Sequence, residues 1–210
     1  MAHRQTARRW LRYLFFAGLM FLLAGCDGPG GEGCGGVDAF AACLNITRIQ
    51  PIDGNGTETS DVDVIFNPDC NGDGIRDDPE PFTRHDATVT FSNEAFPTAD
   101  EGLPITVQRF TVSYSLVICP QDAICPPLSG FSETVSLSVP EGATVSGQFA
   151  LVPISVKDEF IDQGGTASAF PTYSANYTFV GETDFFEDAV TLQSSVSFVM
   201  GNFNNCQTTL

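Results

Sequence analysis

The stretch "ITVQRFTVSYSLVIC" at residues 105–119 is the longest strand candidate in the sequence and decides the fold class. Its apolar residues recur at every second position, first as Ile105 and Val107 and then, shifted by one position, as alternate residues of 110–118. Side chains of a strand alternate between two faces, so a shift of one position moves them to the other face unless the backbone adapts. The pattern therefore predicts one long strand with a bulge, or a change of sheet, near Arg109.

Similar short runs, separated by Gly, Pro, Asn and Asp, precede and follow this strand. "DGNG" at residues 53–56 is a strong turn signal. The strands expected are 44–52, 61–66, 87–91, 105–119, 134–139, 147–154, 172–180 and 190–200, with one short helix at 156–162. Many strands without alternating helices predict an all-β fold, an antiparallel immunoglobulin-like β-sandwich of about eight strands, with a partly closed barrel as the alternative.

The first 25 residues have the composition of an export signal. Four arginines come first, an uncharged apolar run covers residues 13–23, and small residues precede Cys26. The apolar run is too short to be a comfortable membrane span. General secretion fits better than twin-arginine export, because the residues that follow Arg8 and Arg9 match the twin-arginine pattern poorly.

The segment ends in "LAGC" at residues 23–26, which resembles the lipobox of bacterial lipoproteins. The resemblance covers residues 1–26 alone and implies that Cys26 is diacylated and becomes the new N-terminus. It places the chain in the bacterial cell envelope, anchored to a membrane on the periplasmic or outer surface. Asp27 resembles the signal that keeps lipoproteins of enteric bacteria in the inner membrane, and mildly favours that membrane over the outer one. An ordinary secretory signal is the alternative.

The predicted division is a signal peptide at 1–25, a Gly-rich flexible tether at 26–43, a β-sandwich domain at 44–206 and a tail at 207–210. With four of the nine basic residues in the signal, the mature chain keeps five against 26 acidic residues, a formal net charge of −21. Such a surface repels nucleic acid and anionic lipid headgroups. Acyl chains must therefore hold the protein to the membrane, and its expected partners are cations, a basic protein or another envelope component.

Six cysteines follow Cys26, and in an exported chain they predict up to three disulfides. They are Cys34, Cys43, Cys70, Cys119, Cys125 and Cys206. If residues 44–52 and 61–66 pair as a hairpin through "DGNG", Cys43 and Cys70 lie near its open end. That hypothesis favours the pairs Cys43–Cys70, Cys119–Cys125 and Cys34–Cys206.

The stretch "NPDCNGDGIRDDPEP" at residues 67–81 concentrates mutually repelling carboxylates. Calcium takes six to eight oxygen ligands at about 2.3 to 2.6 Å, and alternate residues of a twelve-residue loop can supply them around a glycine at its sixth position. Counted from Asp69, Gly74 holds that position. The predicted ligands are Asp69, Asn71, Asp73, the carbonyl of Ile75, Asp77 and Glu80.

The string "DCNGDGIRDDPE" resembles the calcium loops of thrombospondin type 3-like repeats and, more loosely, an EF-hand. It departs from both, because there is a single copy, prolines flank Glu80, and strands rather than helices are predicted around it. We therefore expect a structural calcium ion rather than a calcium switch. Asp78 is expected to face solvent. The alternative is an exposed acidic turn without a metal, since Asn-Gly and Asp-Gly are common turn dipeptides.

Residues suited to catalysis are scarce beyond the signal. His85 is the one histidine and Lys157 the one lysine, and the sequence holds no nucleophile elbow, zinc-protease helix or phosphate-binding glycine turn. His85 is expected to be solvated or to cap a strand. The sequence predicts no enzyme but a structural or binding module, with a surface adhesin or assembly subunit for a protein or glycan partner as the alternative and a hydrolase as the less favoured one.

Overall fold

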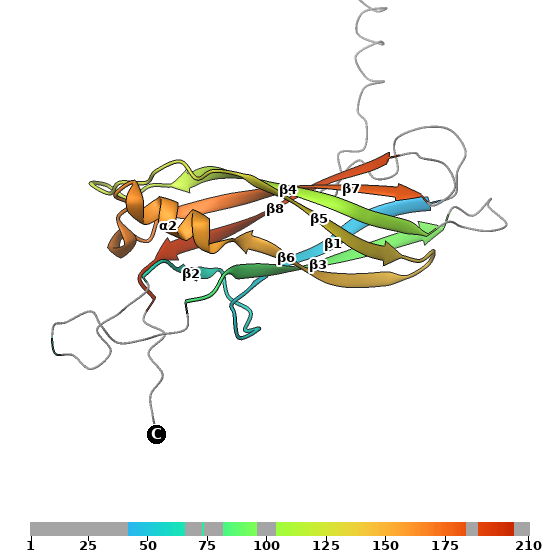
Figure 1. Cartoon of the computed structure of the whole chain (residues 1–210), viewed down its shortest axis with the longest axis horizontal. Helices are drawn as coiled ribbons and strands as arrows, with labels where there is room; N and C mark the ends of the chain where they lie inside the picture. Colours follow the sequence, from blue (N-terminus) through green and yellow to red (C-terminus); the bar gives the residue numbers. More distant parts are fainter. Residues whose placement is uncertain (1–41, 66–72, 74–81, 96–103, 184–188, 204–210) are drawn as a thin grey trace, which may run out of the picture.

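The computed structural model describes residues 42–65, 73, 82–95, 104–183 and 189–203, and strands dominate it (Figure 1). The all-β prediction is thereby confirmed. In chain order the elements are β1 (Ala42–Ile52), β2 (Asp61–Asp63), β3 (His85–Ala95), β4 (Ile105–Ile118), β5 (Phe131–Val139), β6 (Thr144–Val152), helix α2 (Ile154–Asp162), 3-10 helix η1 (Ala167–Ala169), β7 (Thr172–Thr183) and β8 (Ala189–Gly201).

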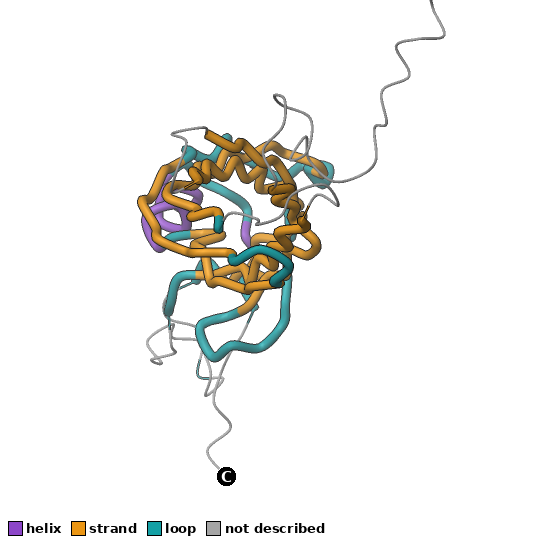
Figure 2. Tube along the Cα trace, turned by 90° about the vertical axis from the view of Figure 1, so that its right-hand side faces the viewer, coloured by secondary structure: helices purple, strands orange, loops and turns teal. Residues whose placement is uncertain are grey.

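The strands form two sheets that face each other across one core. One sheet has the order β1-β3-β6 and the other the order β2-β8-β7-β4-β5. Neighbouring strands are antiparallel except for β2, which pairs with β8 in parallel. Figure 2 looks along the long axis of Figure 1 and shows the strands around the interior that the core side chains fill.

The break predicted near Arg109 is present in β4. The pairing of β4 shifts register between Val107 and Arg109 against both of its neighbours, β5 and β7. Gln108 and Arg109 are both exposed, whereas Val107 and Phe110 on either side are fully buried. The extra residue therefore returns the second half of β4 to the same core that the first half faces.

The core between the sheets is built on phenylalanine. Phe91 of β3 and Phe149 of β6 meet Phe110 and Phe179 of the opposite sheet, with ring centroids 5.1 to 5.9 Å apart in edge-on contacts for Phe91–Phe149, Phe91–Phe179, Phe110–Phe149 and Phe149–Phe179. Edge-to-face pairs of this kind stabilise a core beyond the area they bury. They also fix how the two sheets lie on each other.

Tyrosine hydroxyls connect the two sheets through hydrogen bonds. Tyr114 of β4 donates to the carbonyl of Leu151 at 2.5 Å, and Tyr177 of β7 donates to the carbonyl of Ala150 at 2.9 Å, both acceptors lying on β6. Burial raises the pKa of both hydroxyls well above the usual value, so both stay protonated donors. Tyr173 and Tyr177 lie in the core and are 1% exposed, while Tyr114 is half-buried against it.

The turn predicted at residues 53–56 is present, but the hairpin expected from it is wrong. The carboxylate of Asp53 accepts from the backbone N–H of Asn55 and Thr57, and Gly56 takes a positive φ of 80°. The returning chain meets β1 through one bridge, Ile52 with Glu58, and then crosses to the other sheet. There β2 pairs along β8, because this edge lets Val62 and Val64 enter the core.

The disulfide predictions have different outcomes. Cys119 and Cys125 lie at disulfide distance, with their sulfur atoms 2.13 Å apart, as the sequence predicted. Cys34, Cys70 and Cys206 lie outside the described residues. The pairing Cys43–Cys70 loses its argument, since the hairpin that motivated it does not form. The helix predicted at 156–162 is α2, which begins two residues earlier.

We expect Tyr177→Phe to reduce the free energy of unfolding by about 1 to 2 kcal/mol, because the buried carbonyl of Ala150 loses its donor. Urea unfolding measures the loss, and amide hydrogen exchange locates it in β6. Tyr173→Phe is the matched control, since its hydroxyl donates to Pro126 rather than across the sheets. It should destabilise the fold without faster exchange in β6. Unchanged exchange in β6 of Tyr177→Phe contradicts the role given to this bond.

Candidate functional site

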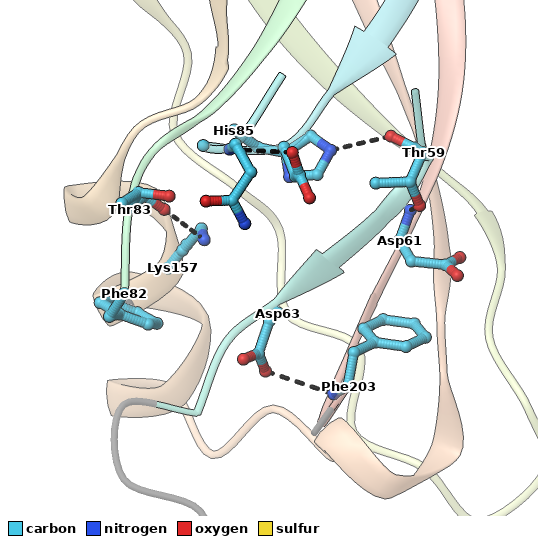
Figure 3. A pocket seen from close by; sticks show the side chains of 11 residues that line it. Thr59, Asp61, Asp63, Phe82, Thr83, His85, Lys157 and Phe203 are labelled. Carbon is cyan, nitrogen blue, oxygen red and sulfur yellow. Dashed lines mark hydrogen bonds between the residues drawn. The ribbon is translucent and has the colours of Figure 1, made fainter. Parts of the chain in front are cut away.

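A pocket of about 300 Å³ lies at the end of the fold where β1 stops and β2 begins (Figure 3). Asp63 and Phe82, which both line it, flank the predicted calcium loop in the sequence. Its walls come from the turn after β1, the crossing segment, the entrance of β3, α2 and the chain after β8. The lining residues are Asp53, Gly54, Asn55, Thr59, Asp61, Asp63, Phe82, Thr83, His85, Lys157 and Phe203.

His85 is buried at the start of β3 and fastens the crossing segment to it. Its Nε2 lies 2.9 Å from the carbonyl oxygen of Thr59, so this nitrogen carries the proton and donates. Burial lowers the pKa of the imidazole below its usual value of 6.5, and the charge of Lys157 acts in the same direction. The bond to Thr59 and the carboxylates of Asp53 and Asp86 oppose this shift. Of the two roles expected for His85, solvation is wrong, because the side chain is 3% exposed, whereas a capping role agrees with its bond to a backbone carbonyl at the start of β3.

Lys157 is 3% exposed, although it lies in a helix at the end of the fold. Its ammonium donates to the carbonyl of Thr83 at 2.7 Å and lies 4.7 Å from the ring centroid of Phe82. A lysine can be buried in this way when its charge meets carbonyl oxygens and an aromatic face. Lys157 thereby joins α2 to the segment that leads into β3.

Two aspartates that line the pocket, Asp53 and Asp63, accept hydrogen bonds from backbone N–H groups. Asp53 caps its own turn, as described above. Asp63 is 7% exposed, and its Oδ1 accepts from the N–H of Ile65 at 3.2 Å and of Phe203 at 3.3 Å. Asp61 is exposed. Among the described residues, no group of three or more acidic, histidine or cysteine side chains is arranged to hold a metal ion.

The predicted calcium ligands fall almost wholly outside the part of the chain that the structure describes. Asp73 is the exception, and it lies exposed in a bend. Asp69, Asn71, Ile75, Asp77 and Glu80 are outside, as is Cys26, the predicted site of lipid attachment. The calcium site thus stays a prediction from the sequence.

Sequence reasoning missed both His85 and Lys157, although each carried a signal. His85 lies two and four residues before Ala87 and Val89, so the inward phase of β3 extends back to it. Lys157 follows Val156 and lies three residues before Phe160, on the buried face of α2. For both residues, the position in the apolar period indicates burial more reliably than the polarity of the side chain.

No model of a known protein family matches the chain, and no curated protein matches it. Among solved structures, the chain is similar to one described as the crystal structure of a protein from Archaeoglobus fulgidus, with 9% sequence identity and a TM-score of 0.37. The match covers 74% of this chain and 97% of that one. A similarity of this size carries no statement about fold or function. Within the described residues, no helix is long and apolar enough to cross a membrane.

We expect the fold to lose stability as the pH falls below about 6.5, because the unfolded chain then binds a proton at His85 that the native state resists. At pH 5.5 the free energy of unfolding should fall by at most about 1.4 kcal/mol through this one group. Urea unfolding of the wild type and of His85→Gln at pH 7.5 and pH 5.5 measures it, since glutamine can still donate to Thr59 but does not titrate. An equal pH dependence of the two proteins contradicts the assignment.

Proposed function

We propose that the protein is a lipid-anchored, non-catalytic structural or binding module of the bacterial cell envelope, with an immunoglobulin-like β-sandwich that calcium stabilises. The observation that carries this proposal is the position of the two ends of β1. Ala42, the second-to-last residue of the stretch predicted as tether, begins the strand, and Ile52 ends it at the pocket (Figure 1). Eleven residues of strand span about 36 Å. An anchor at Cys26 would therefore be joined to the end of β1 that lies away from the pocket.

The immunoglobulin-like assignment is supported by the strand order. In such domains one sheet contains strands A, B and E side by side, and the other contains G, F and C. Here β1, β3 and β6 correspond to A, B and E, and β8, β7 and β4 correspond to G, F and C. β5 is an added edge strand beside β4. A partly closed barrel is less favoured, because the strands form two sheets with separate orders.

The pocket end supports a binding or structural role better than a catalytic one. His85 and Lys157 both donate to backbone carbonyls, and Asp53 and Asp63 both accept from backbone N–H groups. These side chains are occupied in shaping the end of the fold. A surface adhesin or assembly subunit that binds a protein or glycan partner is the second candidate, favoured by apolar side chains exposed at this same end.

Lipid anchoring predicts that Cys26→Ala moves the protein from the membrane fraction to the soluble fraction. The cause is the loss of the thiol that receives the diacylglycerol, since a net charge of −21 gives the chain no attraction of its own to anionic lipid. Labelling with radioactive palmitate in growing cells measures acylation directly. Cys34→Ala is the matched control and should keep both label and membrane association. Label retained in Cys26→Ala contradicts the anchor.

The calcium loop predicts a rise in melting temperature that is specific to calcium, because an ion that binds only the native state stabilises it by mass action. Thermal unfolding of the oxidised protein with calcium, magnesium or chelator measures it. Asp73→Ala should abolish the rise, whereas Asp78→Ala, outside the ligand register, should keep it. No rise in melting temperature at calcium up to about 1 mM would contradict the calcium site and favour an acidic turn without a metal at residues 67–81.

A further inference from the structure

We propose that the last part of β4, Ser113–Ile118, is a docking edge at which an extended, apolar segment of a basic partner protein adds a strand to the five-stranded sheet. The inference rests on the proposed function as a binding module. It names the surface that binds and the chemistry of the partner, which that function leaves open.

The edge exists because β4 is longer than its neighbour on one side. Against β7 the pairing of β4 continues to Ile118, but against β5 it ends at Val112, which pairs with Phe131. Among the described residues, no strand pairs with β4 on that side beyond Val112. Gly130, just before β5, still packs against β4 here, where a Cβ atom would lie 2.5 Å from the carbonyl oxygen of Val112 and 3.5 Å from the Cα of Ser113, so the open part of the edge lies beyond this contact. An open strand edge of this kind is a template for another strand.

Apolar side chains surround this edge and are exposed to an unusual degree. Leu116, Val117 and Ile118 are 45%, 54% and 57% exposed. Ile124, at 56%, lies in the loop that the Cys119–Cys125 disulfide closes onto the end of β4. We call these four residues the distal apolar surface. Several large apolar side chains exposed along one edge of a protein that is otherwise strongly charged favour an interaction site there.

The distal apolar surface is held in place by backbone contacts. The N–H of Ile124 donates to Oγ1 of Thr166, and the N–H of Thr166 donates back to the carbonyl of Ile124, each at 2.9 Å. Ser129 donates through its N–H and its hydroxyl to the carboxylate of Glu159 on α2. These bonds fix the loop against α2 and η1, so the apolar side chains are presented by a braced structure.

The charges around this surface determine which partner fits. The loop and α2 carry four acidic residues, Asp122, Asp158, Glu159 and Asp162. Residues 113–130 and 153–170 contain a single basic residue, Lys157, and it is buried. A second copy of the chain would bring like charges together. An extended segment with alternating apolar residues could pair with the open edge of β4, and lysines or arginines beside them would attract the surrounding acidic residues.

The test uses two synthetic peptides of sequence KKVTVSVTVKK and EEVTVSVTVEE, labelled and titrated with the full oxidised chain in a fluorescence anisotropy assay. We expect saturable binding of the lysine peptide alone, weakening as salt screens the charges. Val117→Lys should reduce the affinity at least about tenfold, because a lysine on an open edge opposes strand addition. Ser136→Lys, on the edge strand β5 of the same sheet, is the matched control and should leave affinity unchanged.

Four outcomes overturn the proposal. They are no binding of the lysine peptide at about 1 mM, equal binding of the glutamate peptide, equal loss in the two variants, and self-association in ultracentrifugation that Val117→Lys abolishes, which would make a second copy the occupant. Melting temperatures of both variants exclude unfolding as the cause of a loss. Because the assay requires neither lipid nor calcium, its failure is distinguishable from failure of the anchor or of the calcium loop.

Discussion

The arrangement of the fold depends on the hydrogen bonds that Tyr114 and Tyr177 send across the core to β6. Each connects a central strand of the five-stranded sheet to an edge strand of the other sheet, so neither sheet can slide along its partner without losing a buried bond. The chain continues from β6 directly into α2. Fixing β6 therefore also fixes the helix that carries Lys157, and with it the end of the molecule where the pocket lies.

Charge is distributed unevenly between the sheets and their ends. In the central register of the five-stranded sheet, the outward positions are small and uncharged, as with Ser113, Asn176 and Ser195, which lie side by side. The acidic residues gather in turns, in α2 and in the predicted calcium loop. Repulsion among them is weakest where the chain can spread into solvent. At the pocket end, the positive charge of Lys157 is buried.

Sequence reasoning succeeded where a local pattern has one structural solution. The apolar residues change phase at Arg109, and side chains that alternate with a period of two can do so only where the strand is interrupted. The break in β4 was therefore predictable. The Cys119–Cys125 disulfide is also present, but the argument that favoured it began from a hairpin that does not form. For β2, the local pattern was equally clear, yet it identified only a strand. Its partner, β8, lies more than a hundred residues further along the chain, and no local signal specifies such a pairing.

The geometry of β1 has a mechanical consequence. A pull on the chain at Ala42, resisted at the far end of the molecule, would act along the axis of β1. This strand is hydrogen-bonded to its antiparallel neighbour β3 over almost its whole length. The hydrogen bonds between these strands lie across the direction of pull and would share the load, so they would have to break together rather than one after another. A fold tethered in this way resists traction by shear, and it would yield far more easily if it were peeled from the opposite end.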